Sequence, residues 1–95
     1  MPIIIQLIED LKTLIPGLPL NNGEQNSLTV KLDGAIADLS KTPPNVPPAC
    51  GKLKAFANQV QAFIQSSALT QAEGQPLIDA VTVIRTELGC FQFEK

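Results

Sequence analysis

The two cysteines of this chain lie at matching distances on either side of one turn. Cys50 opens a segment with helical periodicity that runs to about Ser67, and Cys90 closes the next such segment, which begins near Thr70. About 19 residues separate Cys50 from the turn, and about 21 separate Cys90 from it. At a rise of about 1.5 Å per helical residue, both cysteines lie roughly 30 Å from the turn, so an antiparallel hairpin would bring them level.

We therefore predict a disulfide between Cys50 and Cys90. It would close a loop of some 40 residues, and such bonds persist in oxidising compartments, which predicts an exported protein. Two free cysteines that act as small buried apolar residues are the alternative. A redox-active pair is disfavoured because the chain has no Cys-x-x-Cys, and a zinc site would lack its other soft ligands.

Four segments have the apolar spacing of amphipathic helices: approximately residues 3–15, 24–41, 48–67 and 71–88. The sequence from Thr70 to Glu73 has the form of an N-terminal capping box, and Gly89 suits a C-terminal cap. Pro76 lies close to that capping box and favours an irregular first turn. We predict an all-α fold, a four-helix and mostly antiparallel bundle that forms one domain over residues 1–95, with a disulfide-stapled C-terminal hairpin.

A proline-rich connector separates the second and third predicted helices. Residues 42–48 contain four prolines, which favour extended polyproline geometry over helix. The segments on either side are too small to fold separately, so we interpret the connector as a loop within one domain.

Composition excludes several classes of function. The chain has no histidine, which removes the commonest general base and metal ligand. Its carboxylate groupings, Glu9 with Asp10 and Asp33 with Asp38, are expected on solvated helix faces. The seven Lys and Arg are scattered and predict no nucleic-acid surface, and no apolar run reaches the roughly 18 residues of a membrane span. We therefore predict no enzyme activity, no cofactor and no metal site.

Two residue types, glycine and phenylalanine, leave alternatives open. Gly34 and Gly51 fall inside predicted helices, where close helix packing is the simple interpretation and backbone access for a ligand is the other. The four phenylalanines close a small core in one interpretation and form an exposed patch for a partner or a second copy in the other. These candidate interaction residues are Phe56, Phe63, Phe91 and Phe93.

Three blocks of the chain resemble, in order and spacing, the FIMAH domain, a small all-helical module of bacterial and archaeal proteins. The blocks are Asn26-Ser27-Leu28 with Lys31-Leu32; Leu53-Lys54-Ala55-Phe56 with Asn58-Gln59-Val60; and Leu69-Thr70-Gln71-Ala72-Glu73 with Leu77-Ile78, Ile84 and Leu88-Gly89-Cys90. The resemblance covers about 65 residues, and some members resemble this chain in carrying a cysteine before the third helix and another after the last. The proline-rich connector is a departure in composition.

The resemblance implies a context and no catalytic residues. FIMAH-like modules occur in large secreted or surface-attached proteins, beside enzyme, carbohydrate-binding or adhesion-type domains. Residues 1–5 do not form a signal peptide, because they lack a positive region, so an export signal would lie outside these 95 residues. We expect a non-catalytic structural or interaction module that presents a rigid helical surface to a neighbouring domain, a second copy or an extracellular polymer. The alternative is a small carrier that holds an apolar ligand between its helices.

Overall fold

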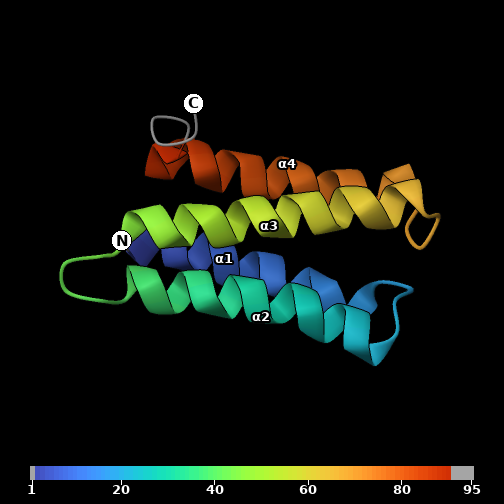
Figure 1. The fold of residues 1–95 in the computed structure, drawn as a ribbon, viewed down its shortest axis with the longest axis horizontal. Helices are drawn as coiled ribbons and strands as arrows, with labels where there is room; N and C mark the ends of the chain where they lie inside the picture. The colour runs from blue at the N-terminus through green and yellow to red at the C-terminus, as the bar shows by residue number, and fades with distance from the viewer. Residues whose placement is uncertain (1, 91–95) are drawn as a thin grey trace.

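The computed structural model describes residues 2–90 and folds them into four α-helices and one short 3-10 turn (Figure 1). The elements are α1 (Pro2–Leu14), the 3-10 turn η1 (Ile15–Gly17), α2 (Asn22–Leu39), α3 (Val46–Gln65) and α4 (Gln71–Leu88). Successive helices run in opposite directions, and α1 lies against both α2 and α4, so the helices close into a ring. The predicted all-α, four-helix, antiparallel bundle is confirmed.

The start of α2 is set by its capping residue. The backbone N–H of Glu24 donates to the Asn21 side chain at 2.8 Å, and the Asn21 N–H donates back to the Glu24 carboxylate at 3.1 Å. This reciprocal pair satisfies two amides that have no partner within the helix. The helix therefore begins at Asn22, two residues before the start that we predicted from apolar spacing.

The ends around the proline-rich connector also differ from the prediction. Helix α2 ends at Leu39 instead of residue 41, because Thr42 precedes a proline and such residues disfavour helical geometry. Helix α3 begins at Val46 instead of Pro48, since prolines are tolerated in a first turn, where the amides are unpaired. It ends at Gln65 instead of residue 67, and Ser67 has a left-handed φ of 66°.

The bounds of α4 agree with the prediction. Glu73 N–H donates to the Thr70 hydroxyl at 3.1 Å, and Thr70 N–H donates to the Glu73 carboxylate at 2.8 Å, which is the predicted capping box. Gly89 follows the helix with a left-handed φ of 74°. The expected irregular first turn is not present, and Pro76 lies inside continuous helix. Proline removes only the bond to the carbonyl of Ala72, which belongs to an exposed residue that water can reach.

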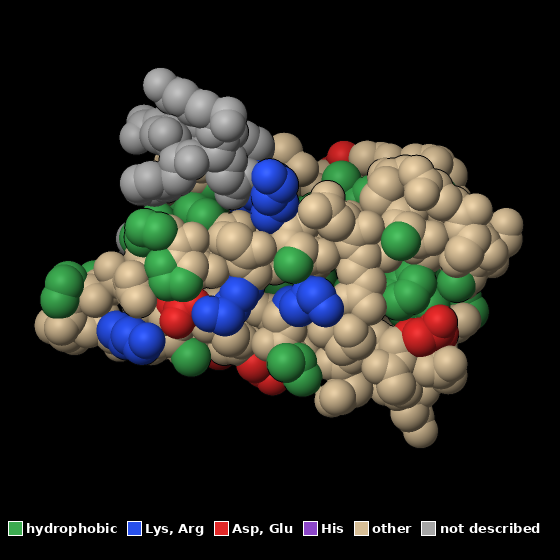
Figure 2. Space-filling model, in the orientation of Figure 1, with side chains coloured by type: hydrophobic (Ala, Val, Ile, Leu, Met, Phe, Trp, Pro, Cys, Tyr) green, Lys and Arg blue, Asp and Glu red, His purple; other side chains and the backbone are tan. Residues whose placement is uncertain are grey.

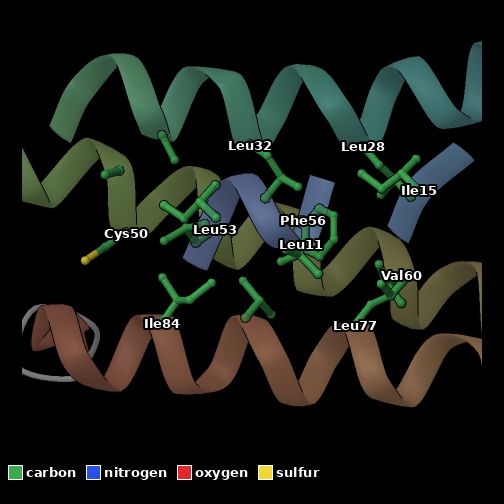
Figure 3. Close-up of a cluster of buried hydrophobic side chains, with 14 of the residues drawn as sticks. Leu11, Ile15, Leu28, Leu32, Cys50, Leu53, Phe56, Val60, Leu77 and Ile84 are labelled. Atoms are coloured by element: carbon green, nitrogen blue, oxygen red, sulfur yellow. The ribbon is translucent and has the colours of Figure 1, made fainter. Parts of the chain in front are cut away.

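The core is a filled cluster of aliphatic side chains around one phenylalanine (Figure 3). Phe56 of α3 is fully buried, and in the close-up it lies beside Leu11 of α1, between α2 and α4. The other large, fully buried side chains come from all four helices and two connectors: Ile8, Leu11, Ile15, Leu28, Leu32, Leu39, Leu53, Val60, Leu69, Leu77 and Ile84. Each such burial stabilises the fold by about 1.5–3 kcal/mol before entropy is counted.

Candidate functional site

The predicted disulfide joins the ends of α3 and α4 that lie farthest from their connecting turn. Cys50 and Cys90 are bonded, their Cα atoms are 5.4 Å apart, and 40 positions separate them in the chain. Both cysteines are buried, at 1% and 0% exposure. The register inferred from their spacing is therefore correct, and the hairpin is connected at both ends, by the turn and by the sulfurs.

A buried carboxylate lies near the same end of the molecule. The Asp38 side chain of α2 is only 9% exposed, and it forms ion pairs with Lys52 of α3 and, at 3.6 Å, with Lys41, which follows the end of α2. The expectation that Asp38 lies on a solvated face is wrong. Lys52 reaches across from α3 and covers the Asp38 carboxylate. Apolar spacing within α2 could not predict this contact, because the covering residue belongs to another helix.

Lys52 reaches Asp38 by passing over a glycine. A Cβ atom placed on Gly34 would lie 2.8 Å from Cδ and 3.0 Å from Cε of Lys52. Gly34 lies one helical turn before Asp38, so the lysine stem covers the first residue and its ammonium group meets the second. Close packing therefore explains Gly34. Gly51 is different, because a Cβ there would meet nothing within 4 Å.

The backbone of Asp38 holds the proline-rich connector. Its carbonyl oxygen accepts a hydrogen bond from the N–H of Asn45 at 2.9 Å and one from Lys41 at 3.4 Å. Asn45 directly precedes α3. Asp38 thus binds the connector through its backbone carbonyl, and it binds α3 through its carboxylate.

These contacts shift the titration of Asp38. The hydrogen bond from Lys52 lowers the pKa of the Asp38 carboxyl below its usual value, and the positive charges of Lys52 and Lys41 act in the same direction. Burial opposes the shift, because a low-dielectric environment disfavours the charged form. The carboxylate is therefore ionised at neutral pH and acts as a structural anion.

A second polar contact also joins α2 to α3. The amide nitrogen of Gln59 donates to the Ser27 hydroxyl at 2.8 Å, and Lys31 Nζ donates to the same oxygen at 3.2 Å. All three side chains are half-buried. Together with the Asp38 cluster, this contact fixes the relative position of the two helices at two levels.

The structure divides the four candidate phenylalanines. Phe56 is fully buried and fills the centre of the bundle, so the core interpretation is confirmed for this residue and the alternative of an exposed interaction surface is wrong. Phe63 is half-buried and packs against the core. Phe91 and Phe93 lie outside the described residues.

Over residues 2–90, the structure shows no pocket, no group of three or more ligands that could hold a metal ion, and no helix long and apolar enough to cross a bilayer. The other predicted carboxylates, Glu9, Asp10 and Asp33, belong to exposed residues, and Asp33 pairs with Lys12 between α1 and α2. The structure does not bring these groups together.

Comparison with protein-family models, with curated protein sequences and with solved structures finds no match for this chain.

Sequence reasoning missed the Asp38–Lys52 cluster and the half-buried Ser27–Gln59 contact. One local signal was present, since a helical glycine four residues before an aspartate leaves room for a long side chain from elsewhere. Nothing in the sequence identified that side chain as Lys52.

Proposed function

We propose that this chain is a non-catalytic structural or interaction module of a larger exported bacterial or archaeal protein. It would present a rigid helical surface to a neighbouring domain or another extracellular partner. The observation that carries the proposal is the buried Cys50–Cys90 bond at the open end of the α3–α4 hairpin. Disulfides of this kind belong to oxidising compartments, where they constrain small domains with modest cores.

The polar contacts of the bundle support a scaffold role. Among the described residues, Asp38 has the most buried carboxylate, which pairs with two lysines, while its backbone carbonyl accepts a hydrogen bond from the loop amide of Asn45. Ser27 and Gln59 bind each other across α2 and α3. These groups hold helices in register, so their chemistry is used for structure.

The resemblance to the FIMAH domain supports the proposed context. That family of small helical modules occurs within large secreted or surface-attached proteins and has no catalytic activity attached to it as such. This chain resembles that family in its order of helical blocks, and it resembles some members in carrying a cysteine before the third helix and another after the last. A FIMAH-like module would act by rigid presentation of its outer helix faces.

Export and pairing of the cysteines can be tested in the cells that produce the protein. Thiols are alkylated at harvest, the cells are fractionated, and the chain is detected with an antibody and analysed by mass spectrometry. We expect it in the medium or the cell-surface fraction, within a larger polypeptide, with Cys50 and Cys90 protected from alkylation. A cytosolic chain with both thiols alkylated would overturn the proposal.

The carrier alternative is tested separately. An apolar ligand would need the space that Phe56 and the surrounding Leu and Ile side chains occupy. Titration with a hydrophobic fluorophore distinguishes the two functions. We expect no saturable binding by the folded module, whereas saturable one-to-one binding with retained helical content would establish a carrier.

A further inference from the structure

Exposed large hydrophobic residues gather along one line between α1 and α4. Four such residues are found in the described part of the chain, and they are Ile3 at 78%, Leu14 at 49%, Val30 at 57% and Val83 at 55% exposure. Helix geometry places three of them, all except Val30, on the outer edge of the α1–α4 contact. This line, formed by Ile3, Leu7, Leu14, Pro76, Ala80 and Val83, is the α1–α4 seam.

On α1, the position of the seam follows from Lys12. Its ion pair with Asp33 shows that this side of α1 faces α2. A helix turns about 100° per residue, so Ile3, nine residues earlier, points in the opposite direction. Leu7 and Leu14 lie on the same edge as Ile3. Helix α1 packs against two helices, α2 and α4, so the edge that points away from α2 lies toward α4. Half-buried Leu7 packs against the core, and Ile3 and Leu14 continue outward from it.

On α4, the packing around Gly74 shows which side of the helix faces its neighbour. A Cβ on Gly74 would lie 2.5 Å from Ile64 of α3, so this side of α4 faces α3. Val83 follows nine residues later and therefore points away from α3. Half-buried Ala80 lies between Val83 and the core on the side toward α1. The two edges together form an apolar stripe along two antiparallel helices.

Carboxylates border this stripe. By the same geometry, Asp10 lies on the outer side of the α1 edge, and Asp79 and Glu87 lie one helical turn before and after Val83 on α4; all three residues are exposed. Lys12 lies on the opposite edge of α1, and Arg85 lies on the α3 side of α4. Helices α1 and α4 together carry five acidic and two basic residues, whereas α2, α3 and their connector carry three acidic and four basic residues. Figure 2, in which α2 and α3 lie at the front, shows basic side chains interspersed with acidic ones on that other face.

We infer that the α1–α4 seam binds an amphipathic helix whose apolar stripe is flanked by Lys or Arg. Two neighbouring helices accept a third along the line between them, and the apolar positions of α1 span about three turns of such a partner. The bordering carboxylates select a cationic flank. A second copy of this chain would bring the same carboxylates against one another. This inference rests on the proposed interaction function and names the partner chemistry of its surface.

The test uses synthetic 14-residue helical peptides and the whole disulfide-bonded chain. One peptide has a leucine stripe flanked by lysines, a second has glutamates in place of the lysines, and a third is a scrambled version of the first. Binding is measured by fluorescence anisotropy at low and high salt. We expect saturable, salt-weakened binding of the lysine peptide alone, with NMR shift changes confined to the outer edges of α1 and α4.

Matched variants locate the binding surface. Ile3→Ser/Val83→Ser should weaken binding of the lysine peptide by about tenfold or more, whereas Val30→Ser, which removes an apolar residue of α2 about as exposed as Val83, should change it less than about twofold. Asp10→Lys/Glu87→Lys should weaken the lysine peptide and strengthen the glutamate peptide. Glu9→Lys, an exposed position one turn before Lys12 on the α2 side of α1, controls for net charge. All these positions are exposed, and circular dichroism checks that each variant remains helical.

Several results would overturn the inference. They include equal binding of the lysine and glutamate peptides, binding that the seam variants do not change, and a concentration-dependent dimer in sedimentation that Ile3→Ser/Val83→Ser abolishes. Binding to anionic phosphatidylglycerol vesicles in place of the peptide would likewise assign the surface to a membrane. The peptide-binding result does not depend on the result of the localisation test. Failure of the α1–α4 seam to bind the peptide can therefore be distinguished from failure of the exported-module proposal.

Discussion

Three of the glycines inside helices differ in the space around them. A Cβ on Gly51 would meet nothing within 4 Å, and a Cβ on Gly34 would press on the flexible stem of Lys52. A Cβ on Gly74 would lie 2.5 Å from Cδ1 and 2.6 Å from Cγ1 of Ile64, at the contact of α3 with α4. The same residue type therefore has a packing role at two positions and none that the structure shows at Gly51.

These surroundings predict opposite effects for the same substitution. Gly51→Ala should stabilise the protein by up to about 1 kcal/mol, because alanine is the better helix former and the site is open. Gly74→Ala should destabilise it by about 1–3 kcal/mol, because Ile64 must move out of a packed interface. Urea unfolding of the two variants measures both values. Equal effects of the two substitutions would show that the α3–α4 contact is not as close as described.

Asp38 predicts how stability depends on acid. Its pKa in the folded protein is lowered, chiefly by the hydrogen bond from Lys52, so its contribution to stability is complete above the unfolded value of about 4 and is lost as pH falls through the lower folded value. Asp38→Asn should cost about 1 kcal/mol at pH 7, a modest amount because the Lys52 side chain is 41% exposed.

The measurement is urea unfolding of the wild type and Asp38→Asn across this range. The difference in free energy of unfolding should stay constant from pH 7 to about pH 5 and shrink below about pH 4. Lys52→Met keeps the apolar stem over Gly34 and removes the charge, so it should remove the same pH-dependent contribution. A difference that persists unchanged near pH 2.5 would contradict the assignment to Asp38.

The helices are started by unequal caps. Helices α2 and α4 each begin with a reciprocal capping box, from Asn21 and Thr70 respectively. Helix α3 begins after Asn45, whose side chain makes no capping hydrogen bond. The start of α3 is held instead by prolines in its first turn and by the Asn45 amide bound to the Asp38 carbonyl.

Alanine substitution at the three caps should reflect this difference. Asn21→Ala and Thr70→Ala should each cost about 1 kcal/mol, because each leaves a helical amide without its acceptor. Asn45→Ala should cost a few tenths of a kcal/mol at most, since its backbone bond to Asp38 remains. Thermal unfolding followed by circular dichroism ranks the three variants. An equal cost at Asn45 would show that its side chain caps α3 in solution.

The disulfide acts on the molecule as a whole. Helices α3 and α4 contact each other along their length, and the bond closes the end that their turn leaves open. It restricts the unfolded chain across 40 positions, which is worth about 4 kcal/mol in the chain-entropy description. For a domain of 95 residues, this is a large fraction of the usual net stability.

Removing the bond should therefore lower stability without changing the architecture. Cys50→Ala/Cys90→Ala should lose about 2–4 kcal/mol of unfolding free energy and keep its helical content at 25 °C. Urea unfolding measures the loss, and reduction of the wild-type protein provides an independent comparison. A loss below about 1 kcal/mol would show that the unfolded chain is not restricted by this bond.

The sequence by itself determined the helices, their order and the cysteine register. Apolar spacing, a capping box and proline positions act within a few residues of one another, so they can be read without knowledge of the fold, and matching distances around one turn were sufficient to pair Cys50 with Cys90. Phe56 could not be assigned in this way, because spacing along α3 does not say which of its edges other helices cover. The core position of Phe56 required all four helices in place.

Only the tertiary structure determined which polar groups are buried and where the exposed apolar side chains lie. Asp38 is buried because Lys52 reaches it from another helix, and the exposed Ile3 and Val83 lie on two helices, α1 and α4, that pack against each other. Such contacts join residues distant in the chain, and their partners are chosen by how whole helices pack. The sequence therefore specified a stapled bundle, and the packing of its helices determined which surfaces remain available for a partner.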